Sequence, residues 1–262
     1  MTITIAAWNV NSIKARLERT LEWVREARPD VLCLQELKCE EAAFPREAFE
    51  DEGYNVAVDG QKTYNGVAVL SKFPIEETLR GLPGGDGDDH ARYLEAVIAA
   101  PSRPIRVVSV YMPNGNPAPG PKYDYKLSWM DRLITRTREL LDYEEVLAIA
   151  GDYNIIPTAD DVHDPAAWAD DALFRPESRA KYRALLNLGL TPAFEQSGGG
   201  AHQYTFWDYQ AGAWQRNNGI RIDHILLSPE GADRLRGFTI HKDERAKEKP
   251  SDHVPVVAEL DV

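Results

Sequence analysis

Residues 146–154 read VLAIAGDYN, an apolar run that closes with glycine, aspartate, tyrosine and asparagine. Small and branched apolar residues in a short run that ends at a glycine predict a buried β-strand over residues 146–151. The polar side chains of Asp152 and Asn154 then follow the carboxyl end of that strand. The same pattern, an apolar strand followed by polar side chains, recurs along the chain and decides the fold that we predict.

Other short runs are predicted strands because most are rich in valine and isoleucine and end at glycine, proline or asparagine. They cover residues 4–10, 31–35, 55–58, 66–71, 93–99, 105–111, 221–227 and 254–260. Apolar residues at helical spacing predict helices over residues 12–28, 122–143 and 177–188. Ser12 is the predicted cap of the first helix, and Pro29 follows its end.

The predicted strands carry few polar positions, so both faces of each sheet need cover, which favours helices outside the sheets. No serine- or glycine-rich linker divides the 262 residues, and layered α/β proteins of this length often form one unit. We therefore predict an α/β fold in a single domain, residues 1–262. Two packed, mixed β-sheets flanked by helices would form a four-layer sandwich.

The composition limits the class of protein. Apolar residues make up 43% of the chain, charged residues 27%, and the mean hydropathy is -0.44, as in soluble proteins. No apolar run approaches the roughly 18 residues that suggest a membrane span. The amino terminus lacks a secretory signal, so we expect a cytoplasmic protein, and nothing in the sequence suggests more than a monomer. The two cysteines, Cys33 and Cys39, predict neither a zinc site nor a disulfide framework.

The net charge of -12 counts weakly against a protein that binds nucleic acid. A bound metal would cancel several acids locally, and binding to DNA needs only one basic face on an acidic body. Candidates for that face are Lys38, Lys62, Arg92, Lys122, Lys126, Arg216 and Arg221.

Polar residues also end the apolar segments AWNVN at residues 7–11, LQE at 34–36 and RIDH at 221–224, while SDH at 251–253 precedes a strand. Strand ends converge at one edge of a layered sheet, so their carboxylates can share one cleft. The carboxylates concerned belong to Glu36, Asp152, Asp223 and Asp252. Carboxylates crowded together require a cation, and oxygen ligands suit Mg²⁺ or Mn²⁺. Any one acid is equally well explained as a loop cap; the whole set with a histidine predicts a metal site.

His253 is the histidine with an evident chemical setting, because Asp223 at a strand end can pair with it. A carboxylate fixes the imidazole tautomer and favours the charged form. A cationic His253 facing a phosphoryl group would stabilise negative charge in the transition state. The other histidines are interpreted as surface or hydrogen-bonding residues; they are His90, His163, His202, His224 and His241.

In this order the motifs resemble the endonuclease/exonuclease/phosphatase superfamily and, within it, the exodeoxyribonuclease III family of bacterial class II apurinic/apyrimidinic (AP) endonucleases. The supporting segments span nearly the whole chain: WNVNS at 8–12, LQELK at 34–38, NGVAVLS at 65–71, YMPNG at 111–115, GDYN at 151–154, TFWDY at 205–209, RID at 221–223 and KPSDH at 249–253. The resemblance implies a DNase I-like fold and a DNA-repair phosphodiesterase. Such an enzyme degrades duplex DNA from 3' to 5', cuts 5' to abasic sites and removes blocked 3' ends.

The resemblance also implies roles for individual residues. Glu36 would bind Mg²⁺, which Mn²⁺ can replace, in a metal site completed from Asn9, Asp152, Asn154, Asp252 and His253. Asp152, supported by Asn154, would orient and deprotonate the attacking water in an in-line hydrolysis. His253, paired to Asp223, would contact the scissile phosphate. Further phosphate contacts implied are Tyr111, Asn114 and Arg92, with Lys38 and Lys126 as weaker candidates.

A second implied feature is a pocket for an extrahelical sugar that lacks its base. Residues 204–207, YTFW, with Ile220 and Ile222, resemble that pocket, which would admit a deoxyribose whose stacking is already lost. Phe206 and Trp207 are also explained as ordinary core aromatics. Human-type enzymes carry tryptophan at the position of Ile220. Because isoleucine is smaller, this wall of the pocket would be smaller and would permit more exonuclease action.

Duplex DNA with abasic sites or blocked 3' ends is thus the predicted partner, and two other functions stay open. A phosphatase acting on inositol or lipid phosphates would use the same catalytic residues. Phe206, Trp207 and the turn at Asn114 count against it. A non-catalytic nucleic-acid-binding scaffold would have lost an acid or the histidine, whereas all are present here.

Overall fold

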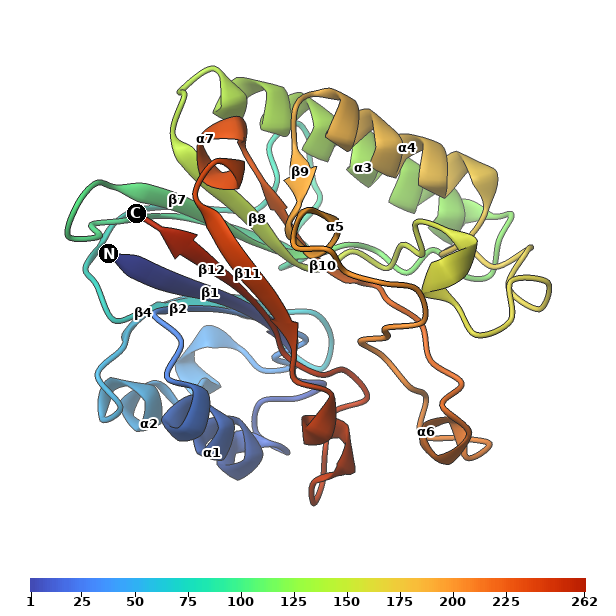
Figure 1. Ribbon diagram of the computed structural model, residues 1–262, viewed down its shortest axis with the longest axis horizontal. Helices are drawn as coiled ribbons and strands as arrows, with labels where there is room; N and C mark the ends of the chain where they lie inside the picture. Colours follow the sequence, from blue (N-terminus) through green and yellow to red (C-terminus); the bar gives the residue numbers. More distant parts are fainter.

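The computed structural model describes all 262 residues and shows two six-stranded β-sheets packed face to face (Figure 1). The first sheet has the order β11-β12-β1-β2-β4-β3, and the second has the order β5-β6-β7-β8-β10-β9. One neighbouring pair in each sheet is parallel, β1 with β2 and β7 with β8, and the other pairs are antiparallel. Both sheets are therefore mixed, as predicted.

The first sheet consists of β1 (Thr2–Asn9), β2 (Val31–Gln35), β3 (Asn55–Asp59), β4 (Val67–Ser71), β11 (Leu235–Ile240) and β12 (Val256–Asp261). The second consists of β5 (Ile75–Arg80), β6 (Tyr93–Ile98), β7 (Ile105–Tyr111), β8 (Val146–Asp152), β9 (Thr191–Pro192) and β10 (Asp223–Leu227). The helices are α1 (Leu17–Ala27), α2 (Arg46–Glu50), α3 (Pro121–Leu141), α4 (Pro176–Asn187), α5 (Ala193–Gln196), α6 (Ala213–Arg216) and α7 (Pro229–Ala232). Short 3-10 turns cover Glu41–Ala43, Ala159–Asp161 and Lys242–Ala246.

Three apolar layers hold the sheets and helices together. Between the sheets, 23 buried residues form one cluster, which includes Cys33. On the outer face of the first sheet, α1 and α2 pack through residues such as Trp23, whose ring lies 5.5 Å from that of Trp8. On the outer face of the second sheet, α3 and α4 cover residues such as Ile149 (Figure 1). The four-layer α/β sandwich is confirmed.

The first helix begins at Leu17, so the prediction that Ser12 caps it is wrong. Asn11 and Ser12 adopt left-handed backbone conformations, with φ of 44° and 85°. The N–H of Ser12 donates to the carbonyl of Glu36 at 2.7 Å, which ties this segment to the chain after β2 rather than to a helix.

Sequence patterning misses three edge strands, β5, β9 and β11. Their side chains are half-buried or exposed throughout, so none of the three shows the apolar run of a central strand. The predicted strand over residues 221–227 begins two residues later, at Asp223. No helix combines the length and the hydropathy that crossing a membrane would require.

Candidate active site

The central strands bring polar residues from both sheets to one edge of the sandwich. In the first sheet β1 ends at Asn9, which is in register with the last residue of β2, and Glu36 follows directly. In the second sheet β8 ends at Asp152, which is in register with Asp223 at the start of antiparallel β10. Face-to-face packing of the sheets thus places acids from distant parts of the chain side by side.

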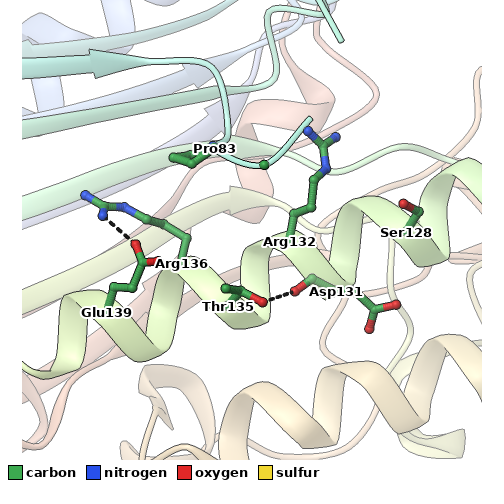
Figure 2. Close-up of a pocket in the computed structure, with 8 residues that line it drawn as sticks. Pro83, Ser128, Asp131, Arg132, Thr135, Arg136 and Glu139 are labelled. Carbon is green, nitrogen blue, oxygen red and sulfur yellow. Dashed lines mark hydrogen bonds and ion pairs between the residues drawn. The ribbon is translucent and has the colours of Figure 1, made fainter. Parts of the chain in front are cut away.

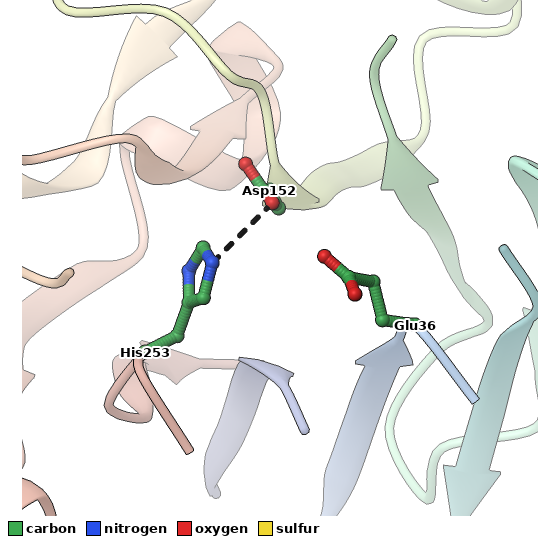
Figure 3. A group of neighbouring side chains, drawn as sticks. All are labelled: Glu36, Asp152 and His253. Carbon is green, nitrogen blue, oxygen red and sulfur yellow. Dashed lines mark ion pairs between the residues drawn. The ribbon is translucent and has the colours of Figure 1, made fainter. Parts of the chain in front are cut away.

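Glu36, Asp152 and His253 point toward one another across this edge (Figure 3). Each offers a ligand atom, and these atoms all lie within 4.8 Å of one another, a spacing that suits a shared metal ion. The side chain of Asn9 bridges the two acids, because its Nδ2 donates to Glu36 Oε1 at 2.9 Å and to Asp152 Oδ2 at 2.9 Å. The predicted ligand Asp252 lies outside this group of three and accepts a hydrogen bond from Asn11 at 3.1 Å.

Glu36 lies where several groups favour its charged form. Lys38 Nζ is 2.8 Å from Oε2, and the hydroxyl of Tyr111 donates to Oε1 at 2.9 Å. Burial alone would raise the pKa of Glu36, but the hydrogen bond from Asn9 and the ammonium of Lys38 outweigh it and lower the pKa. The carboxylate is therefore ionised at neutral pH and ready to bind a cation.

Asp152 is almost fully buried, and its environment has the opposite effect. Burial raises its pKa to about 7, with the charge of Asp223 adding to the rise and the cationic His253 opposing it. The backbone N–H of Asn154 donates to Oδ1 at 2.8 Å and fixes the carboxylate. A carboxylate with a pKa close to neutrality is suited to general-base catalysis.

His253 is held between two carboxylates. Its Nδ1 lies 2.9 Å from Asp223 Oδ2, and its Nε2 lies 3.7 Å from Asp152 Oδ2. The hydroxyl of Thr205 donates to Asp223 Oδ2 at 2.6 Å, and Trp8 Nε1 donates to the carbonyl of His253 at 3.1 Å. Burial would lower the pKa of His253, but Asp223 and Asp152 raise it to about 10. The imidazole therefore carries a positive charge at neutral pH.

Around this group lie three of the predicted phosphate contacts. The guanidinium of Arg92 sits 4.7 Å from the ring centroid of Tyr111 and donates to its carbonyl at 3.3 Å. The Nε atom of Arg92 is buried and has no partner within the protein. Asn114 is exposed, and its Nδ2 donates to Asn154 Oδ1 at 3.2 Å.

Comparison with known proteins identifies relatives of this chain. Residues 6–253 match the endonuclease/exonuclease/phosphatase family. The chain belongs to this family. Exodeoxyribonuclease III of Haemophilus influenzae is 33% identical over 97% of this chain and 98% of its own length. An AP endonuclease from Archaeoglobus fulgidus superposes with a TM-score of 0.94 at 37% identity, covering 99% of this chain and 100% of that structure. A variant of the Neisseria 3' phosphatase NExo, bound to a product DNA hairpin, gives the same TM-score of 0.94, identity of 37% and coverage of 99% and 100%.

In this endonuclease/exonuclease/phosphatase site, Lys126 is not on the surface, where the predicted contact with a phosphate would require it to be. Lys126 is completely buried, and its Nζ donates to the carbonyls of Asn154 at 2.6 Å and Asn114 at 3.0 Å. Burial lowers its pKa to about 7, against the pull of Asp152 and Asp171. Lys126 therefore joins the loops that follow β7 and β8 from beneath and presents no surface to a substrate.

Of the residues predicted to form the sugar pocket, one lies at the candidate active site and the others lie behind it. Phe206 is half-buried, and its ring centroid lies 4.9 Å from that of His253. Ile220 and Ile222 are buried and form the apolar cluster that supports Phe206. Trp207 has no exposed surface and packs edge-on against another tryptophan at 5.0 Å, so the predicted contact between Trp207 and substrate is wrong.

The prediction that Arg221 belongs to a basic binding face is wrong, because Arg221 is only 2% exposed. Its Nε donates to Asp161 Oδ1 at 2.8 Å, and its Nη2 donates to Glu195 Oε1 at 2.6 Å. His224 lies 3.1 Å from Nη1, and burial holds the pKa of His224 well below its usual range. Sequence reasoning misses this network, because a charged residue beside a strand gives no sign of its own burial.

A separate hollow of about 360 Å³ lies on α3, away from the candidate active site (Figure 2). It is lined by Pro83, Gly84, Ser128, Asp131, Arg132, Thr135, Arg136 and Glu139. Its charged groups have partners within the protein: Arg136 pairs with Glu95 and Glu139, and Arg132 with Asp88. Because these charges are satisfied internally, the candidate active site remains the edge around Glu36 and Asp152.

Proposed function

We propose that the protein is a magnesium-dependent DNA-repair phosphodiesterase. Its activities would be 3'-to-5' exonuclease action on duplex DNA, cleavage 5' to abasic sites, and removal of phosphate and other blocks from 3' ends. The observation that carries this proposal is that the carboxylates of Glu36 and Asp152 and the imidazole of His253 converge, with one atom of each within 4.8 Å of the others. The named activities of the relatives, an exodeoxyribonuclease, an AP endonuclease and a 3' phosphatase, support the choice of substrate.

The donor atoms fit Mg²⁺, with Mn²⁺ as a substitute, because carboxylate and amide oxygens predominate. Glu36 and Asp152 would hold the cation, with Asn9, Asn154 and Asp252 beside them. The cation would neutralise charge on the phosphate and on the leaving oxygen. We assign His253 to the phosphate rather than to the metal, because an imidazole protonated on both nitrogens has no lone pair to donate.

The protein's own groups would carry out the remaining steps. Asp152, kept in place by the N–H of Asn154, would take the proton from the attacking water. The protonated His253, kept in place by Asp223, would face the negative charge that develops on the phosphate. Tyr111, Arg92 and Asn114, around the same edge, would bind the phosphate oxygens and set the in-line geometry.

The position of Phe206 beside His253 favours damaged DNA as substrate. A sugar without a base can leave the helix at low cost and contact this half-buried ring, whereas an intact nucleotide must first be unpaired and unstacked. We further propose that residues 1–262 form one catalytic domain, acting as a cytoplasmic monomer on duplex DNA. Both sheets contribute residues to the single site, which supports the proposal of one domain.

The experiment that tests the proposal compares substrates under one set of conditions. A labelled duplex with one abasic analogue, the matched intact duplex, and soluble inositol phosphates are each incubated with Mg²⁺ or with excess chelator. We expect magnesium-dependent incision of the abasic duplex. Faster phosphate release from the inositol phosphates would favour the phosphatase alternative, and DNA binding without cleavage would favour a non-catalytic scaffold.

A further inference from the structure

A polar pair lies inside the apolar layer between the two sheets, at the end nearest the candidate active site. Gln35, the last residue of β2, and Ser109 of β7 are both completely buried. Gln35 Nε2 donates to Ser109 Oγ at 3.0 Å, and Ser109 Oγ donates onward to the carbonyl of Leu34 at 3.2 Å. Elsewhere in this layer the side chains are almost entirely alanine, valine, isoleucine and leucine.

The amide of Gln35 also lies close to Gly151 in the strand that carries Asp152. A Cβ added to Gly151 would lie 3.1 Å from Gln35 Nε2 and 2.0 Å from the carbonyl oxygen of Val110. Gly151 has a φ of 149°, a conformation that residues with a side chain rarely adopt. Glycine at this position therefore leaves room for the Gln35 amide against the backbone of β8.

The positions of these residues in the chain connect the pair to the acids. Gln35 directly precedes Glu36, and Gly151 directly precedes Asp152. The pair therefore lies between the two chain segments that present the carboxylates, one from each sheet. The hydrophobic effect is non-directional, whereas a hydrogen bond fixes both distance and direction.

This arrangement has a cost that packing alone does not explain. The Oε1 atom of Gln35 is buried and has no hydrogen-bond partner within the protein, and an apolar side chain of the same length would avoid burying it. A polar residue at this position is understandable if its hydrogen bond sets a distance that an apolar contact would leave free.

We propose that Gln35 and Ser109 are positioning residues whose hydrogen bond sets the separation between Glu36 and Asp152, and thereby the affinity of the site for a divalent cation. This inference rests on the proposed function. Neither residue touches substrate; both act through the backbone that presents the carboxylates, much as hydrogen bonds behind metal ligands tune other sites.

The test uses the full-length, metal-free protein and Mn²⁺, with calorimetric titration as the main measurement. Ser109→Ala and Gln35→Met each remove the hydrogen bond, and methionine keeps the length of the glutamine. Ser109→Thr keeps the hydroxyl and serves as the rescue variant. Ser228→Ala is the matched control, because Ser228 is also buried and its Oγ accepts from the N–H of Leu147 and donates to the carbonyl of Glu145, near the opposite end of β8.

We expect Ser109→Ala and Gln35→Met each to weaken Mn²⁺ binding about tenfold or more. Incision of an abasic duplex should show a lower kcat with an unchanged KM for DNA. The double variant should lose no more than either single variant, because the two side chains make one interaction. Ser109→Thr should bind Mn²⁺ as the wild type does, and Ser228→Ala should lower the denaturation midpoint without changing Mn²⁺ affinity.

Wild-type Mn²⁺ affinity in either Ser109→Ala or Gln35→Met would overturn the inference, as would an equal loss of affinity in Ser228→Ala. A wild-type protein that neither binds Mn²⁺ nor incises DNA would instead overturn the proposed function itself. The two failures are therefore distinguishable in one set of measurements.

Discussion

The Nδ1 atom of His253 lies 2.9 Å from Oδ2 of Asp223, and both residues are buried. The pair joins the ends of the two sheets, because Asp223 begins β10 of the second sheet and His253 lies just before β12 of the first. Because the buried carboxylate stabilises the imidazolium, the positive charge persists at neutral pH and above. This relationship gives the site a cation of its own, next to the general-base candidate Asp152.

We expect Asp223→Asn to lower kcat by about 10²- to 10⁴-fold, because an amide cannot stabilise the imidazolium. With Asp223, the raised pKa keeps His253 protonated up to about pH 10. Without it, burial still lowers the pKa and only Asp152 and Asp252 oppose that effect, so the residual activity should fall at a lower pH than wild-type activity does. The pH–rate profile of cleavage checks this, with exposed Asp208→Asn as the control; identical profiles for Asp223→Asn and wild type would argue against the pairing.

Asp152 should titrate near pH 7 in the metal-free protein, because burial raises its pKa. A divalent cation favours the charged carboxylate, so Mg²⁺ should move this titration to lower pH. Carboxyl-carbon NMR of aspartate-labelled protein measures both values, and Asp152→Asn assigns the signal. A titration unaffected by saturating Mg²⁺ would place the cation elsewhere.

Lys126→Met should lower kcat about tenfold and leave the KM for DNA unchanged, because Lys126 holds the carbonyls of Asn114 and Asn154 from below. Exposed Lys247→Met is the control and should retain wild-type kcat. Steady-state kinetics on an abasic duplex distinguish the two roles. A rise in KM with an unchanged kcat would instead indicate that Lys126 contacts a phosphate, as predicted from the sequence.

The identity of the central acids follows from sequence, whereas the burial of long side chains does not. Glu36, Asp152 and Asp223 lie at ends of short apolar strands, and such ends converge in a layered sheet whatever the details of packing. Lys126 and Trp207 illustrate the limit: a lysine or an aromatic near a motif has the same sequence signature whether it lies on the surface or beneath it. Only the packing of α3 and of the loop around α6 decides between these cases.

The edges of the sheets escape prediction for a related reason. An edge strand such as β5 is mostly exposed and carries charged residues, so its pattern resembles a loop. The error at Ser12 has a different origin, because its backbone hydrogen bond to Glu36 depends on a segment distant in sequence. Long-range hydrogen bonds of this kind cannot be deduced from local spacing.

Phe206→Ala should lower kcat/KM for an abasic duplex about tenfold or more, because it removes the apolar surface beside His253. Digestion of an intact 3' end should change much less, since no extrahelical sugar needs to be held there. Phe206→Leu keeps an apolar side chain, so its kcat/KM for the abasic duplex should lie between the values for the wild type and for Phe206→Ala. Equal losses on both substrates would show that Phe206 supports His253 rather than a pocket.

The most direct measurement is incision of a 5'-labelled duplex that contains one tetrahydrofuran abasic analogue. We predict a single Mg²⁺-dependent nick on the 5' side of the analogue, made at least about tenfold faster than any cut in the matched intact duplex. Excess chelator should abolish the nick, and Asp152→Asn should slow it by about 10³-fold or more. Equal cleavage of the two duplexes, or incision that persists in chelator, would contradict the account.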